Sequence, residues 1–122
     1  MISTIAVFFG GGFGAVVRFF ISKFFSHIYK GDLPISTLFS NLISCLVVGL
    51  FFAFISESKY INHNLKLFIL VGFCGGLSTF STFSLETIEL LKSGNYYWAI
   101  MNIGLSILLC FGMLLFFYKK IV

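Results

Sequence analysis

A chain of 122 residues that is 59% hydrophobic and only 10% charged is too apolar for a soluble domain, in which about a quarter of residues carry charge. Its length excludes a second domain, so residues 1–122 are expected to form a single transmembrane domain. The net charge of +4 does not indicate nucleic-acid binding, because the basic residues are scattered at the ends of apolar segments, as is usual for membrane spans.

Four apolar segments are long enough to cross a bilayer, which takes roughly 20 residues. We therefore expect an all-α membrane protein with short connectors, of which Glu57–Asn64 is the most polar. The first segment lacks a basic leader and a small-residue cleavage site, so we take it as a retained span. The predicted spans are about Ile2–Phe25, Leu33–Ile55, Leu65–Leu91 and Tyr96–Tyr118.

The first span carries four glycines within Gly10–Gly14, a surface on which another helix can lie close. Arg18 follows in the same segment. Three roles stay open for Arg18: a side chain that extends to the interface, a cation that draws anions to a pore mouth, or an anchor for backbone carbonyls. The second and fourth spans each place an amide at membrane depth, Asn41 and Asn102. Such amides commonly bond a neighbouring helix, but an NH₂ group can also donate to an anion.

The third span is interrupted between Val71 and Glu86, where glycines are followed by five hydroxyl side chains in seven residues, Ser78–Ser84. We expect the glycines to free the backbone and to break the helix. Broken helix at membrane depth is tolerated only where protein or a water-filled cavity covers it, so the segment is a candidate ion or substrate site. The alternative is close helix packing by small residues.

Two phenylalanines of this interruption, Phe80 and Phe83, are three residues apart and share a helix face. Phenyl rings have an electropositive edge, which can approach a partly dehydrated anion without trapping it. Glu86 and Glu89 follow, and an acid within a span is a functional candidate by default. An enzyme is not expected, because no nucleophile–base pair or metal cluster is present, and the three cysteines are taken as small buried residues.

Lysine and arginine are balanced between the two sides of the predicted four-span topology, four on each. Since their bias sets orientation, the balance predicts dual topology, with two oppositely inserted copies pairing about an axis in the membrane plane. The alternative is one orientation set by another signal. The residues are Lys59, Lys66, Lys119 and Lys120 on one side, and Arg18, Lys23, Lys30 and Lys92 on the other.

Three stretches together resemble the Fluc (CrcB) family of small fluoride channels: Gly14–Arg18, Thr37–Asn41 and, most specifically, Gly72–Glu86. The likeness covers the whole chain. Two departures are small, because the family usually has Thr at the position of Ser78 and often Gly at that of Ser44.

The resemblance implies an antiparallel, dual-topology homodimer with two fluoride pathways in the bacterial plasma membrane. It implies a passive channel through which F⁻ leaves the cytoplasm, which confers fluoride resistance. It places Asn41 and the ring edges of Phe80 and Phe83 along each pathway, with Ser81 and Thr82 as a hydroxyl track.

The resemblance also implies a central structural Na⁺, held by backbone carbonyls near Gly75 and Ser78 of both copies. Unwound backbone supplies such oxygen ligands in other transporters. The roles of Arg18, Glu86 and Asn102, at the pore mouth or as support, stay open.

The first alternative is a proton-coupled exporter of the small multidrug resistance type, which is also short and antiparallel. Such exporters need a carboxylate in the first span, and Ile2–Phe25 has none. The second alternative is an accessory subunit without transport of its own, which would gain little from a hydroxyl-rich break.

Overall fold

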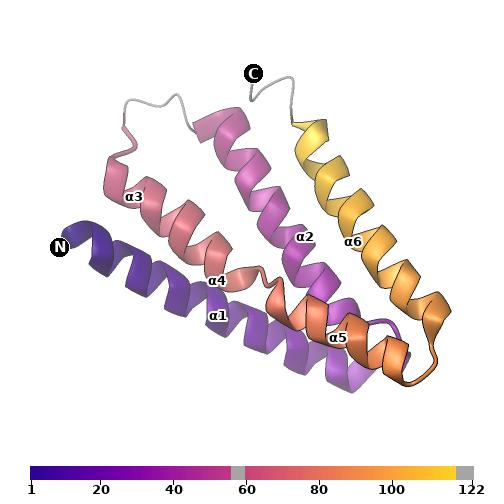
Figure 1. The fold of residues 1–122 in the computed structure, drawn as a ribbon. Coiled ribbons are helices and arrows are strands. Elements are labelled where there is room, and N and C mark those ends of the chain that lie inside the picture. The colour runs from indigo at the N-terminus through magenta and orange to yellow at the C-terminus, as the bar shows by residue number, and fades with distance from the viewer. Residues whose placement is uncertain (56–59, 118–122) are drawn as a thin grey trace.

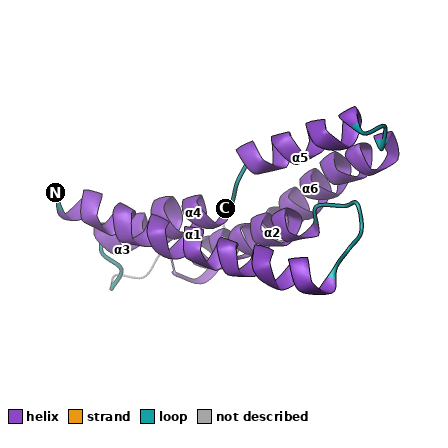
Figure 2. Cartoon of the chain, turned by 90° about the horizontal axis from the view of Figure 1, so that it is seen from below, coloured by secondary structure: helices purple, strands orange, loops and turns teal. Residues whose placement is uncertain are grey.

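The computed structural model describes residues 1–55 and 60–117, and helices joined by loops make up this part of the chain (Figures 1 and 2). The first span is α1 (Ile2–Ile28), and the fourth is α6 (Tyr96–Phe116). The second span begins as α2 (Ile35–Leu50) and ends in a π-helical turn, η1 (Phe51–Ile55). The third span is made of four pieces: α3 (His63–Leu67), the π-helical η2 (Phe68–Cys74), α4 (Gly75–Leu77) and α5 (Ser81–Lys92).

Four helical stretches of the described chain are long and apolar enough to cross a membrane, which confirms the predicted number of spans. The helices of the first and third spans extend one to three residues beyond the expected ends, whereas the second span begins two residues later than expected, at Ile35. Several residues used above in counting charges and drawing ends lie outside the described residues: Glu57, Lys59, Tyr118, Lys119 and Lys120. The four stretches are Ile2–Ile28, Ile35–Ile55, His63–Lys92 and Tyr96–Phe116.

The glycines of the third span do not break the helix, which corrects our expectation. Gly75 has helical dihedral angles, φ −64° and ψ −37°. Gly72 instead lies against Gly10 of α1, and Gly76 against the carbonyl of Gly11. A methyl group added at either position would overlap α1 backbone, so these glycines serve the close approach of two helices. Figure 1 shows the resulting layer, with α1 alongside α3 and α4.

The break lies at the hydroxyl residues that follow. Helix α4 ends at Leu77, and Ser78 is extended, with φ −81° and ψ 155°. Phe80 returns to helical angles and caps α5. Because the backbone leaves the helix at Ser78, the five hydroxyl residues do not lie on one continuous helix. Serine and threonine favour such breaks because their side chains compete for backbone hydrogen bonds.

The break lets the third span pack on different partners at its two ends. Its first half, η2 and α4, lies on α1, whereas α5 lies against α6 (Figures 1 and 2). Helices α2 and α6 pack on each other along their length. The loop between α4 and α5 thus lies between these two packing regions, with α2 bonded to it and α6 on the wall of the same cavity.

The glycine contact of α1 is tested by two substitutions on the same helix. A Cβ at Gly14 would overlap the Phe73 carbonyl, whereas one at Gly12 meets nothing within 4 Å. We expect Gly14→Ala to lose about 1–3 kcal/mol of stability by overpacking. Gly12→Ala is the matched control and should be neutral. Thermal unfolding in detergent, followed by circular dichroism, measures both. Equal loss in the two variants would contradict the assigned contact.

Candidate ion pathway

The extended backbone at the break is held by one side chain of α2. The Thr79 amide donates to Oδ1 of Asn41 over 2.7 Å, and Nδ2 of Asn41 donates back to the Thr79 carbonyl over 3.2 Å. A buried, unpaired peptide group would be costly in lipid, so this two-way bond replaces the helical partners that Thr79 has lost. Asn41 retains a second N–H, because its NH₂ group has two donors.

Carbonyls at the end of α4 are satisfied by other helices as well. Arg18 of α1 donates from Nε to the Gly76 carbonyl over 3.0 Å. The Cys74 carbonyl accepts from the hydroxyls of Ser44, over 3.0 Å, and Ser78, over 2.7 Å. A helix end leaves its last carbonyls without intrahelical donors, and α1 supplies one to Gly76. The Cys74 carbonyl keeps its helical bond from the Ser78 amide, over 3.0 Å, and gains a further donor from α2. Arg18 thus makes the anchoring contact, which is one of the three roles left open by the sequence, and it also lines a cavity.

Two carbonyls at the break lose the amides that a continuous helix would give them. The amide of Thr79, four residues after Gly75, donates to Asn41. The amide of Thr82, four residues after Ser78, donates to Oγ1 of Thr79 over 3.2 Å. Gly75 itself is exposed, and a Cβ there would meet nothing within 4 Å. The residues predicted to hold Na⁺ therefore fit a cation in donor chemistry, because their carbonyl oxygens are released from the helix ladder.

A first cavity, which we call the aromatic cavity, lies between α2, α6 and the break, with a volume of about 300 Å³. It brings together Asn41, Phe80 and Phe83, and every side chain on its wall is uncharged. The centroids of the two phenyl rings are 5.7 Å apart and their planes are tilted by 42°. The wall consists of Asn41, Cys45, Ser78, Thr79, Phe80, Phe83, Ser106, Ile107, Cys110 and Phe111.

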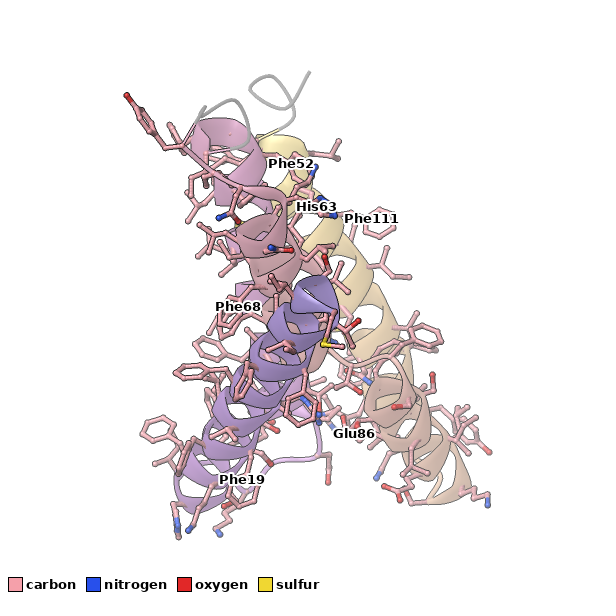
Figure 3. The ribbon with its side chains drawn as sticks, turned by 90° about the vertical axis from the view of Figure 1, so that its left-hand side faces the viewer. Phe19, Phe52, His63, Phe68, Glu86 and Phe111 are labelled. Atoms are coloured by element: carbon pink, nitrogen blue, oxygen red, sulfur yellow. The ribbon has the colours of Figure 1, made fainter. Side chains whose placement is uncertain are left out.

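A second cavity, the polar cavity, lies between α1, α2 and α5, with a volume of about 310 Å³. It holds the two charged candidates, Arg18 and Glu86, and Figure 3 shows Glu86 in the space between α1 and α5. Thr37 donates to Oε1 of Glu86 over 2.7 Å. Thr79 lines both cavities, so the break separates an uncharged chamber from a charged one. The wall consists of Ala15, Arg18, Phe19, Ser22, Ser36, Thr37, Ser40, Thr79, Thr82 and Glu86.

The remaining predicted residues lie apart from the aromatic cavity. Thr82 lines the polar cavity, and the hydroxyl of Ser81 is 3.3 Å from that of Thr79. Asn102 is fully buried and lines neither cavity. It donates from Nδ2 to the Thr87 hydroxyl over 2.9 Å, which donates in turn to the Phe83 carbonyl over 2.8 Å. Asn102 is thus a support that holds the segment bearing Phe83.

Sequence reasoning missed Ser106 as a lining residue. Its side chain is 8% exposed, lines the aromatic cavity, and has no hydrogen-bond partner for its hydroxyl among the described residues. The available signal was its place four residues after Asn102, on the same face of the fourth span. Ser106 therefore adds a second polar side chain, besides Asn41, from the helices that line this cavity.

The family profile described as "CrcB-like protein, Camphor Resistance (CrcB)" matches residues 5–117 of this chain. The chain belongs to this family. Relatives from Salmonella arizonae, Salmonella newport and Salmonella dublin are each named "Fluoride-specific ion channel FluC". Each is 41% identical over 109 residues, which is 89% of this chain and 85% of the relative.

These comparisons confirm the predicted family. They also agree with the expectation that the chain is no enzyme, because its relatives are named as ion channels. With four helices able to span a bilayer, the CrcB-like protein is a multi-pass protein of the bacterial inner membrane.

The support of Phe83 by Asn102 gives a testable prediction. Thr87→Val removes the hydroxyl that links them and leaves the amide of Asn102 unpaired in a buried place. We expect a loss of about 1–3 kcal/mol in unfolding free energy. Thr87→Ser keeps the hydroxyl and serves as the control. Chemical denaturation in detergent measures both variants. Equal stability of Thr87→Val and Thr87→Ser would show that the relay contributes nothing.

Proposed function

We propose that the protein is a passive, fluoride-selective channel that lets F⁻ leave the cytoplasm. The observation that carries this proposal is the aromatic cavity, where Asn41, Phe80 and Phe83 meet on an uncharged wall at a helix break. The names of the relatives support the same ion. The physiological need is simple: HF enters from acidic surroundings, dissociates in the near-neutral cytoplasm and leaves its anion trapped, so a channel relieves the accumulation.

The cavity offers an anion several weak contacts instead of one strong one. The second N–H of Asn41 and the hydroxyl of Ser106 are donors, and ring edges add a weaker attraction. The break also exposes the start of α5, whose first amides lack helical partners and carry partial positive charge. Conduction needs such multi-site, weak binding, and the smaller fluoride ion takes stronger hydrogen bonds than chloride.

The polar cavity is proposed to carry the ion between the aromatic cavity and one membrane surface. Ser81 and Thr82 supply hydroxyls beside the break, and Thr82 faces this cavity. Arg18 attracts anions, while Glu86, held by Thr37, limits how strongly they are retained. The two charges are therefore pore-mouth groups in this proposal.

We further propose that two copies assemble in opposite orientations with one pathway along each. The balance of lysine and arginine between the two sides supports dual topology. Two residues at or near the break are also exposed in the single chain: Phe80, at 79%, and Gly75. In a two-fold symmetric dimer, a second copy would cover these residues, and the first copy would cover the same residues of the second.

A structural Na⁺ is proposed at the axis between the copies. The released carbonyls of Gly75 and Ser78 are the ligands in each chain, and a two-fold axis would double them to four. Sodium is a hard cation that takes oxygen ligands, and unwound backbone is a usual source of them in transporters. Bound there, the ion would hold the two breaks together and offset the charge of nearby anions.

The exporter alternative rests on Glu86 alone. This carboxylate belongs to the third span, and the first span carries none, so the proton site that such exporters use is absent from its expected helix. The relatives named as channels favour conduction over exchange.

Ion efflux from liposomes tests the channel directly. Vesicles that hold the purified protein, Na⁺ and either KF or KCl are opened with valinomycin, and an ion-selective electrode records the anion. We expect rapid fluoride release with chloride retained. Phe83→Ile should slow release at least about tenfold, a barrier increase of about 1.4 kcal/mol.

The control is Phe116→Ile, because Phe116 of α6 has a neighbouring phenyl ring, as Phe83 does, but lies on neither cavity wall. This variant should keep the parent rate. Absence of fluoride release from folded, Na⁺-containing protein would refute the channel, and an unchanged rate in Phe83→Ile would refute the role of the ring.

Opposite insertion is tested with single cysteines at the two ends of the third span, His63→Cys and Ser93→Cys, both exposed positions. A membrane-impermeant maleimide is applied to intact cells, and labelling is measured above that of the parent chain. Dual topology predicts that each variant is labelled in about half of its copies, because each end faces outward in half of them. Full labelling of one variant with none of the other would establish a fixed orientation.

A further inference from the structure

Two cysteines from different helices line the aromatic cavity. They are Cys45 of α2 and Cys110 of α6, and these two helices pack on each other. Cys45 is one helical turn beyond Asn41, and Cys110 is one turn beyond Ser106, so the thiols continue the polar wall by one turn. Both are free and partly exposed. They do not take part in the proposed fluoride contacts.

We propose that Cys45 and Cys110 form a chelating site for a soft divalent cation that prefers two ligands in a line, with Hg²⁺ as the type ion. Thiolate sulfur is the ligand that soft metals select. On binding, two S–H bonds break, two S–Hg bonds form and two protons pass to water. The metal stays in the +2 state, so no oxidant or reductant is needed.

Charge and ligand number both favour this class of ion. Two thiolates neutralise a divalent cation, and a neutral complex suits a cavity whose wall is uncharged and largely apolar. A monovalent soft ion held by both thiolates would leave one negative charge there. Structural zinc takes four tetrahedral ligands, and the described residues contain no group of three or more metal-ligating side chains.

The site also has a consequence that rests on the proposed function. Because the thiols share their cavity with Asn41 and Phe83, a bound Hg²⁺ would occupy the space through which fluoride passes. Soft metal bound there would then block the channel at the aromatic cavity.

Metal retention by the purified protein tests the site without reference to transport. The protein is mixed with one equivalent of mercuric nitrate in chloride-free buffer, challenged with an excess of a monothiol, and desalted; elemental analysis gives Hg per chain. Chelation makes the second S–Hg bond intramolecular, which raises apparent affinity about 100-fold or more over a single thiol. We expect about one Hg per chain to survive the challenge in the parent.

Three variants distinguish a requirement for this pair of cysteines from a requirement for any two cysteines in the chain. Cys45→Ser and Cys110→Ser each keep two cysteines, and each should lose the retained metal. Cys74→Ala, which removes the buried thiol of η2, also keeps two cysteines but should retain metal like the parent. Gel filtration and circular dichroism confirm the fold of each, and Cys45→Ala and Cys110→Ala serve if a serine variant fails to fold. Retention in either Cys45 or Cys110 variant, or loss in Cys74→Ala, would overturn the proposal.

Fluoride efflux on the same samples distinguishes the site from the channel. We expect one equivalent of Hg²⁺ to stop release in the parent and in Cys74→Ala, and to leave Cys45→Ser and Cys110→Ser conducting. Metal retained without block would uphold the site and move the fluoride path away from these thiols. A parent that binds metal but never releases fluoride would refute the channel and leave the site standing.

Discussion

The rest of the structure depends on one constraint: peptide groups exposed by a broken helix inside a membrane must find partners within the protein. Three residues, Ser78 to Phe80, leave the helix, and lipid offers them nothing. The partners come from other spans: the Asn41 side chain bonds both the amide and the carbonyl of Thr79, and Arg18 donates to the Gly76 carbonyl. The positions of the polar residues in α1 and α2 thus follow from the peptide groups that the break leaves without helical partners.

This requirement also explains why the glycines stand where they do. Arg18 reaches the Gly76 carbonyl because α1 lies against α4, and the close approach depends on residues without a Cβ. At Gly14 and Gly76 a methyl group would overlap backbone of the opposite helix. Packing and polar satisfaction are therefore coupled: a bulkier residue at this contact would weaken the helix pair and also withdraw a donor from the break.

Much of the fold can be predicted from the sequence. The four spans follow from hydropathy, and the broken third span follows from a density of glycine and hydroxyl residues that a plain helix would not carry. The separate roles of the glycines and the hydroxyl residues could not be predicted in this way. Composition places Gly72 and Ser78 in one motif, whereas the structure assigns glycine to helix packing and serine to the break. Which residue type takes which role depends on the helix that lies opposite it, and this is a property of the tertiary structure.

Side chains with two plausible roles were the hardest to assign for the same reason. An intramembrane amide bonds either a neighbouring helix or a ligand, and nothing local decides between them. The structure shows the first role for Asn41, whose oxygen and one N–H hold the break, and it also places this side chain on the wall of the aromatic cavity. The pairing of Cys45 with Cys110 was equally hidden, since 65 positions separate two residues that share one wall.

The separation of charge between the two cavities bears on how an anion can pass at all. A fixed cation on the aromatic wall would bind the ion too tightly to release it, and a carboxylate would exclude it. Both charged groups, Arg18 and Glu86, lie instead in the polar cavity, and each has a hydrogen-bond partner from another element. Arg18 is engaged by a backbone carbonyl, which reduces its hold on a passing anion. In the proposed pathway, neutral donors at the break would each bind an ion weakly enough to let it leave.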